Sequence, residues 1–109
     1  MKEGMQNGLV RDEMLIKAAR RFQLLGEPVR LDILNNIQAA GEMNVQELID
    51  ATQQNRANIS KHLRLLATEG MVSRRKDGLY AYYSISDPSL AAICLLVCGQ
   101  IRNEEEVLR

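Results

Sequence analysis

The sequence predicts a mostly helical domain with one small β-hairpin, and three features support this prediction. Apolar residues recur at helical spacing through most of the chain, and glycines and capping residues divide it into separate helices. The pattern changes to alternation on both sides of Asp77-Gly78, a dipeptide typical of hairpin turns. The 109 residues, 46% of them hydrophobic, suit a single domain with one modest core.

The N-terminal part is predicted to contain a flexible segment and then a helix. Residues 1–10 carry two glycines and little apolar pattern, so we expect them to be flexible. The first helix is predicted to begin at Asp12 and to end at Gly26. The apolar side of this helix consists of Leu15, Ala18, Phe22 and Leu25.

A second helix is predicted to begin at Pro28 and to end at Gly41. Proline suits the first turn of a helix, where its missing N–H group would have had no partner within the helix. Glu27, just before it, is predicted to be a poorer cap than Asp or Ser would be. The predicted buried side consists of Leu31, Ile33, Leu34 and Ile37.

Two capped helices joined by a short polar turn follow. Asn44 stands three residues before Glu47, the spacing of a capping box, so a short third helix is predicted to begin there. After the turn at 52–54, Asn55 caps a fourth helix, which ends at Gly70, where a left-handed residue is needed. The predicted buried side of the fourth helix consists of Ile59, Leu63 and Leu66.

The hairpin and a last helix complete the domain. The predicted strands are residues 71–76 and 79–85, and Tyr80 and Tyr82 share one face of the second. Asp87 and Pro88 give the last helix its cap and first turn, and we expect it to run to about Asn103. The predicted order is four helices, two strands and a helix, which is a winged helix-turn-helix over residues 11–103, followed by an acidic tail at 104–109.

The basic residues are concentrated in one segment, although the formal net charge of the chain is zero. Residues 56–76 hold six Lys and Arg against one acid, Glu69, and the run Glu104 to Glu106 offsets part of that surplus. A local cationic surface of this kind is typical of proteins that bind nucleic acid.

The polar side of the fourth helix carries the side chains that a DNA-reading helix needs. An α-helix fits the major groove, where residues of its first turn, here Arg56 and Asn58, reach base edges. Ala57 is small and allows close approach, whereas Lys61 and Arg64 are placed for phosphates. A solvated helix face alone would look similar, but the neighbouring capped helix, the hairpin and the charge favour DNA. The predicted contacts are Arg56, Ala57, Asn58, Ser60, Lys61 and Arg64, with Arg74, Arg75 and Lys76 on the first strand.

Nothing in the sequence indicates catalysis. His62 is the only histidine, and no nucleophile or paired carboxylates accompany it, so a role in packing or phosphate contact is expected. The chain also lacks a glycine-rich loop that would hold a phosphate. A dithiol oxidoreductase is disfavoured because redox pairs generally use a Cys-x-x-Cys motif at a helix start, whereas Cys94 and Cys98 are four residues apart.

Three runs of sequence resemble the ArsR/SmtB family of winged-helix transcriptional repressors. They are FQLLGEPVRLDIL, VQELIDA and NISKHLRLLATEGMVSRRKDGLYAYYSI, and the resemblance extends over about residues 15–103. It implies a homodimer that binds a palindromic operator, an inverted repeat in double-stranded DNA, and that releases it when an inducer arrives. By position, the recognition-helix segment of the family matches Arg56, Ala57, Asn58, Ser60, Lys61 and His62, and its wing matches Arg75, Lys76 and Tyr80.

The metal sites known in that family are not matched. Its arsenic-type site uses paired cysteines in the third helix, and residues 42–46 have none. Its zinc-type site uses Asp and His in the last helix, but the corresponding positions are Asp87, Ser89, Gln100 and Asn103. Ser, Gln and Asn are poor zinc ligands, so neither a metal nor a cofactor is predicted.

Cys94 and Cys98 leave three interpretations open. Both thiols could be small packed hydrophobes, because free cysteine is often part of a core. They could instead form a thiol switch that answers oxidants or reactive sulfur, since a polar product would disturb packing. They could also bind a soft metal or arsenite, provided that a partner chain supplies further thiols. A disulfide between them is disfavoured within an undistorted helix.

The last helix is apolar nearly all round, which indicates that more than one surface must cover it. A domain this small cannot easily do so alone, and a twofold partner would also place two recognition helices about one DNA turn apart. The predicted dimer interface consists of Leu15 and Phe22 of the first helix and Leu90, Cys94, Val97 and Ile101 of the last.

The sequence therefore predicts a dimeric, sequence-specific transcriptional repressor. A winged-helix module that binds an acidic protein, or a regulator without an inducer site on this chain, are the alternatives. The N-terminus lacks the apolar run of a secretion signal, and the charge-free run 88–101 is too short to span a bilayer. We therefore expect a cytoplasmic protein without a membrane partner.

Overall fold

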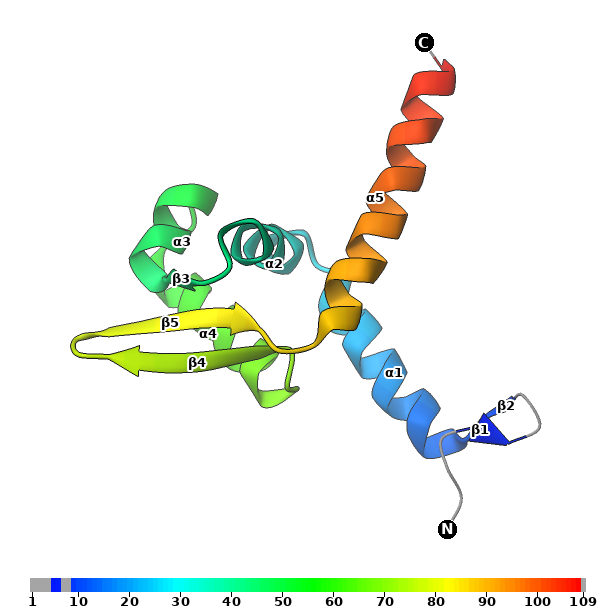
Figure 1. Cartoon of the computed structure of the whole chain (residues 1–109), viewed down its shortest axis with the longest axis horizontal. Coiled ribbons are helices and arrows are strands. Elements are labelled where there is room, and N and C mark those ends of the chain that lie inside the picture. Colours follow the sequence, from blue (N-terminus) through cyan, green and yellow to red (C-terminus); the bar gives the residue numbers. More distant parts are fainter. Residues whose placement is uncertain (1–4, 7–8, 109) are drawn as a thin grey trace.

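The computed structural model describes residues 5–6 and 9–108, and it confirms the predicted order of helices and strands (Figure 1). One short strand, β3, which was not predicted, lies before the third helix and pairs with β5. The elements are β1 (Met5–Gln6), β2 (Leu9–Val10), α1 (Asp12–Leu25), α2 (Pro28–Ala40), β3 (Met43–Asn44), α3 (Val45–Thr52), α4 (Arg56–Thr68), β4 (Val72–Asp77), β5 (Tyr80–Ile85) and α5 (Pro88–Leu108).

The sheet has the order β3-β5-β4, with both pairs antiparallel. Asp77 pairs with Tyr80, so the two turn residues are Gly78 and Leu79, one position later than predicted. Gly78 has φ of 62°, which suits a two-residue turn with glycine first. The shift leaves Leu79 98% exposed at the tip of the hairpin, the wing.

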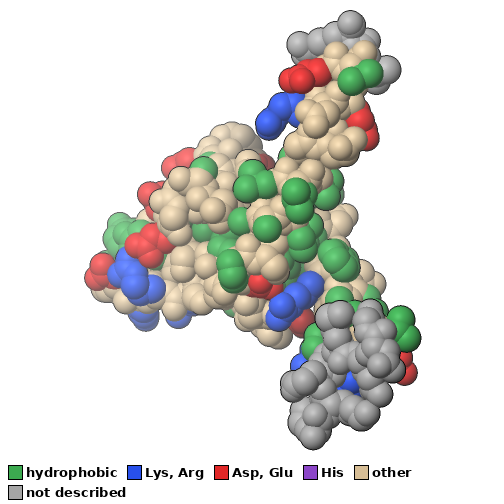
Figure 2. Space-filling view, turned by 45° about the vertical axis from the view of Figure 1, so that its right-hand side comes forward, with side chains coloured by type: hydrophobic (Ala, Val, Ile, Leu, Met, Phe, Trp, Pro, Cys, Tyr) green, Lys and Arg blue, Asp and Glu red, His purple; other side chains and the backbone are tan. Residues whose placement is uncertain are grey.

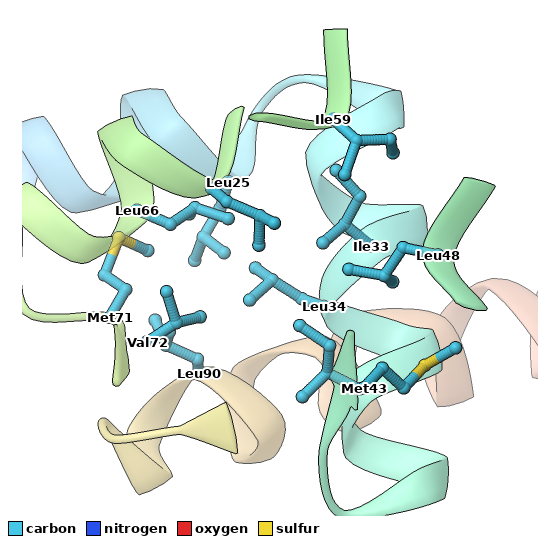
Figure 3. Close-up of a cluster of buried hydrophobic side chains, with 12 residues drawn as sticks. Leu25, Ile33, Leu34, Met43, Leu48, Ile59, Leu66, Met71, Val72 and Leu90 are labelled. Carbon is cyan, nitrogen blue, oxygen red and sulfur yellow. The ribbon is translucent and has the colours of Figure 1, made fainter. Parts of the chain in front are cut away.

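The core lies where α2, α3 and α4 meet the sheet and the first turn of α5. Apolar side chains from these elements and from the end of α1 point toward one another (Figure 3). The predicted buried side of α4 is confirmed, because Ile59, Leu63 and Leu66 are at most 1% exposed. In α2, Ile33, Leu34 and Ile37 are buried, but Leu31 is 39% exposed and was wrongly assigned to the core.

The caps account for most helix boundaries. Asn44 and Glu47 form the predicted capping box, in which each side chain accepts a hydrogen bond from the other residue's backbone N–H. Glu27, which was predicted to be a poorer cap than Asp or Ser, does cap α2: its two carboxylate oxygens accept from the N–H groups of Val29 and Arg30, both at 3.2 Å. These hydrogen bonds, with the Val29 N–H first, lower the pKa of Glu27.

Both ends of the chain differ from the expectation. The last helix continues to Leu108, past the predicted end near Asn103, because glutamates are good helix formers and no glycine or proline interrupts the segment. The acidic residues Glu104 to Glu106 therefore lie on α5. Near the N-terminus, β1 and β2 pair antiparallel. The other six residues of the predicted flexible segment 1–10 lie outside the described residues.

Helices α1 and α5 extend away from the body that carries α2, α3, α4 and the wing (Figure 1). Two ion pairs hold α1 against its neighbours: Arg20 to Glu69 after α4, at 2.7 Å, and Arg21 to Asp87 before α5, at 2.8 Å. Asp87 also accepts from the backbone N–H of Ser89, as predicted for a cap. These ion pairs fix α1 relative to the end of α4 and to the start of α5.

Candidate nucleic-acid interface

The outer face of α4 is polar and open to solvent. Asn55 caps the helix by accepting a hydrogen bond from the N–H of Asn58 at 2.8 Å, which fixes where the first turn begins. Because the opposite side of α4 packs into the core, the polar side must face outward. Arg56, Ala57, Lys61 and Arg64 are exposed, and Asn58 and Ser60 are half-buried.

Two glutamines hold the first-turn side chains of α4. The Nη2 of Arg56 donates to Oε1 of Gln46 on α3 at 2.6 Å, and the Nδ2 of Asn58 donates to Oε1 of Gln54 at 2.7 Å. The predicted base-reading groups are therefore positioned at the N-terminal end of α4, next to α3. Neither glutamine was predicted, since the sequence shows only polar residues at these positions.

Lys61 and Arg64 present unpaired positive charge. Within the part of the chain that the structure describes, neither side chain forms an ion pair with an acid. They are one helical turn apart on the exposed face, where successive phosphates of one strand could contact both.

The predicted wing residues divide between the two faces of β4 and β5. Alternation puts Arg74 and Lys76 on the face that also carries the core-packed Tyr83, while Arg75 and Tyr80 lie on the other. All four predicted side chains are exposed. The helix side and the outer side of the wing therefore each carry part of the predicted set.

Arg75 differs from the other wing cations because it is already paired. Its guanidinium donates to Glu42 at 2.6 and 3.3 Å, lies 3.6 Å from Asp77, and covers the ring of Tyr82 at 4.9 Å. The hydrogen bond from Arg75 lowers the pKa of Glu42, so this pair is ionised at neutral pH. Arg75 thus ties the wing to the loop after α2, whereas Arg74 and Lys76 form no ion pair with an acid among the described residues.

His62 does not belong to the exposed face. It is 5% exposed, and its Nδ1 accepts a hydrogen bond from Nε of Arg30 at 3.1 Å. Its assignment to the DNA-contacting set is therefore corrected, and the expected packing role applies. Its position, three residues after Ile59 and one before Leu63, places it on the inner side of α4.

The predicted dimer face is mostly exposed to solvent in the single chain. Leu15 and Phe22 of α1 are 51% and 58% exposed, and Val97 and Ile101 of α5 are 55% and 48% exposed. Leu90 is only 1% exposed, because it lies in the first turn of α5 and completes the core of its own chain, and Cys94 is half-buried beside that core. Hydrophobic side chains gather over this side of the molecule (Figure 2).

An apolar groove of about 660 Å³ runs between α5, the end of α1 and α2. Cys94 and Cys98 both line it, the first half-buried and the second exposed. Burial, and then the neighbouring Cys98, raises the pKa of Cys94, which keeps that thiol protonated at neutral pH. Within the described residues, no group of three or more His, Cys, Asp and Glu side chains comes together as metal ligands would.

The helices that the structure describes include none with both the length and the apolar character needed to cross a bilayer. The length of α5 does not alter this, because its C-terminal part carries Arg102 and the acidic run.

Comparison with known proteins shows that this chain is similar to transcription regulators of a single family. Residues 27–74 match the sequence profile described as "Bacterial regulatory protein, arsR family". An uncharacterized HTH-type transcriptional regulator of Methanocaldococcus jannaschii is 38% identical over 74% of this chain and 91% of its own length. The arsenical resistance operon repressor of Escherichia coli is 35% identical over 78% of this chain and 73% of its own.

The fold has solved counterparts as well. A homodimeric winged helix-turn-helix DNA-binding domain from Mycobacterium bovis superposes with a TM-score of 0.73 at 30% identity, and 94% of each chain is covered. The predicted winged helix-turn-helix is thereby confirmed.

Proposed function

Because this chain belongs to the ArsR family of bacterial regulatory proteins, we propose that it is a homodimeric repressor that binds an inverted-repeat operator in double-stranded DNA. The family consists of winged-helix transcription regulators, not enzymes. One observation carries the proposal: the outer face of α4 presents unpaired cations on a helix whose other side is fixed in the core. A DNA target also favours the cytoplasm as the place of action.

The contacts divide by their chemistry. Arg56 and Asn58, held at the N-terminal end of α4, suit base edges in the major groove. Lys61, Arg64, Arg74 and Lys76 suit phosphates, which add affinity without sequence choice.

The dimer is supported by the apolar surface that one chain leaves uncovered. The exposed parts of α1 and α5, with the groove between them, form a continuous face of the kind that marks a protein interface. A second copy covers that face by twofold symmetry and sets two α4 helices against two half-sites.

Asn58→Ala and Lys61→Ala should affect DNA binding in different ways. The test selects duplexes from a random pool with the wild-type protein and then compares each variant on the selected duplex and on a scrambled one. Lys61→Ala should weaken binding to both and lower the salt slope by about one unit. Asn58→Ala should reduce the preference for the selected duplex by about 1–3 kcal/mol.

Gln23→Ala serves as the control, because Gln23 is an exposed residue of α1 with no assigned contact to DNA. Unchanged binding in both test variants would reject α4 as the reading helix. Failure of the wild-type protein to bind any duplex near physiological salt would instead support a winged-helix module that binds an acidic protein.

Release from the operator is proposed to occur by oxidation of Cys98, the exposed one of the two thiols that share the groove on the dimer face, whereas burial keeps Cys94 protonated. Hydrogen peroxide transfers one oxygen atom to a thiol and leaves water, and the resulting sulfenic acid is polar. A polar group in an apolar seam weakens the dimer and with it the binding of two half-sites.

Peroxide should therefore lower the affinity of the wild-type protein for its selected duplex but leave that of Cys98→Ser unchanged. The double variant Cys94→Ser, Cys98→Ser is the control for oxidation of methionines, of which the chain has five. Fluorescence anisotropy with and without peroxide measures the effect, and equal loss in wild-type and double-variant protein would exclude the thiol switch.

A further inference from the structure

One contact joins the start of α2 directly to the inner side of the recognition helix α4. The Nε–H of Arg30, in the first turn of α2, donates to Nδ1 of His62 at 3.1 Å. The same guanidinium reaches the carbonyl of Leu24, in the last turn of α1, at 3.5 Å. Arg30 therefore contacts both the helix that extends toward the proposed dimer face and the helix that is proposed to read DNA.

The contact requires a neutral imidazole ring. Arginine has only donors and stays charged, so Nδ1 of His62 must act as an acceptor and the ring proton must be on Nε2. That Nε2 lies 3.7 Å from a carboxylate oxygen of Glu27, the cap of α2. A second proton, on Nδ1, would set two N–H groups against each other and place a positive ring beside a guanidinium.

Burial, together with the cations around the ring, lowers the pKa of His62 and keeps the ring neutral at pH 7. Among the described residues, those facing it are Arg30 and Glu27 at the start of α2 and Lys61 beside it on α4. Burial, followed by the charge of Arg30, lowers the pKa of His62 below its usual 6.5, and Lys61 acts in the same direction. Glu27 opposes them but does not reverse the direction.

We propose that Arg30 and His62 are positioning residues whose hydrogen bond, here called the brace, holds α4 in its DNA-binding orientation. A proton on His62 breaks this hydrogen bond and so releases the brace. The proposal rests on the proposed function, in which α4 reads DNA. Neither residue contacts the duplex in this scheme. Lys61 and Arg64 flank His62 on the outer face of the same helix, so a change in how the inner face is held moves the phosphate contacts.

The sign of the pH effect follows from the geometry. DNA binding favours the neutral ring, so affinity is full above the pKa of His62 and declines as the pH falls through it. For one linked proton the decline is at most about tenfold per pH unit. Folding stability changes in the same direction: since the pKa is lowered in the folded chain, stability is complete above 6.5 and declines as the pH falls below that value.

Proton uptake near neutral pH can be assigned to His62, because it is the only histidine of the chain. In a tag-free protein, a proton taken up between about pH 5 and pH 7 by the wild type but not by His62→Asn belongs to this ring. Asparagine places an amide oxygen near the position of Nδ1, so it can accept from Arg30 but does not titrate.

The experiment measures affinity from pH 5 to pH 8 by fluorescence anisotropy, with the duplex selected by the wild-type protein at pH 8. The wild type should lose affinity on acidification, whereas His62→Asn should bind as the wild type does at pH 8 and give a flat profile. Arg30→Met keeps the aliphatic stem of the side chain but removes the hydrogen-bond donor. It should bind DNA at least about tenfold more weakly at pH 8, which is the effect of losing roughly one charge-assisted hydrogen bond. Its affinity should also stay constant from pH 5 to pH 8. Arg20→Met is the matched control, since its ion pair with Glu69 is on the surface.

Two results would overturn the brace: parallel profiles for the wild type and His62→Asn, or an acid-sensitive profile retained in Arg30→Met. If His62→Asn fails to fold, as circular dichroism would show, the profile of Arg30→Met decides. A wild-type chain that selects no duplex would count against the proposed function itself, which separates that failure from failure of the brace.

Discussion

Val97→Asp yields a monomer and lowers the affinity for an inverted-repeat duplex by about 10²–10⁴-fold, because two linked half-sites gain this much over one. Val97 is 55% exposed on the face of α5 that has no cover in one chain, so an aspartate there does not disturb the core. In a dimer it would place two carboxylates in an apolar seam without partners. Sedimentation velocity gives the mass and anisotropy gives the affinity.

Leu79→Asp is the control for the expected change from dimer to monomer in the sedimentation experiment. Leu79 is a similar apolar residue, 98% exposed, at the wing tip and away from α5. It should leave the dimer intact. A Val97→Asp protein that keeps the mass of a dimer would show that the dimer interface does not include this face of α5.

Leu66→Ala lowers the free energy of unfolding by about 2–5 kcal/mol, because it removes a large side chain from a closely packed core. Leu66 is fully buried at the end of α4, where it meets side chains from α1 and from the segment before β4 (Figure 3). A loss of this size is a large part of the stability of a small domain. Urea unfolding followed by circular dichroism measures it.

The neighbouring residue provides the matched control. Leu65 is on the same helix but is 39% exposed, and Leu65→Ala makes the same chemical change with the same gain in helix propensity. Its effect should be below about 1 kcal/mol. Equal effects at the two positions would contradict the assigned faces of α4.

Local signals made most of the fold predictable. The capping pair Asn44 and Glu47, and the glycines that end α1, α2 and α4, each act within a few residues, so the sequence states them directly. The hairpin was predicted one residue out of register, since Asp77-Gly78 and Gly78-Leu79 both give a short turn and pairing along the strands decides between them.

Contacts between distant residues were not predictable in the same way. Arg75 was assigned to DNA and His62 to the recognition set, but Glu42 and Arg30, their partners, are 33 and 32 residues away. Periodicity likewise places Leu31 and Leu90 on apolar faces without showing what covers them. Leu90 is covered by its own chain and Leu31 only in part.

The position of the acidic run on α5 separates negative charge from the cations of α4 and β4, although the net charge of the chain is zero. Glu104 to Glu106 lie near the far end of that helix, across the molecule from the wing, whereas Lys61, Arg64, Arg74 and Lys76 lie on α4 and β4 (Figure 1). In the field of a polyanion such a charge distribution exerts a torque that turns the cationic end forward before contact. Encounters with DNA are thereby oriented, and raising the salt concentration shortens the distance over which this alignment acts.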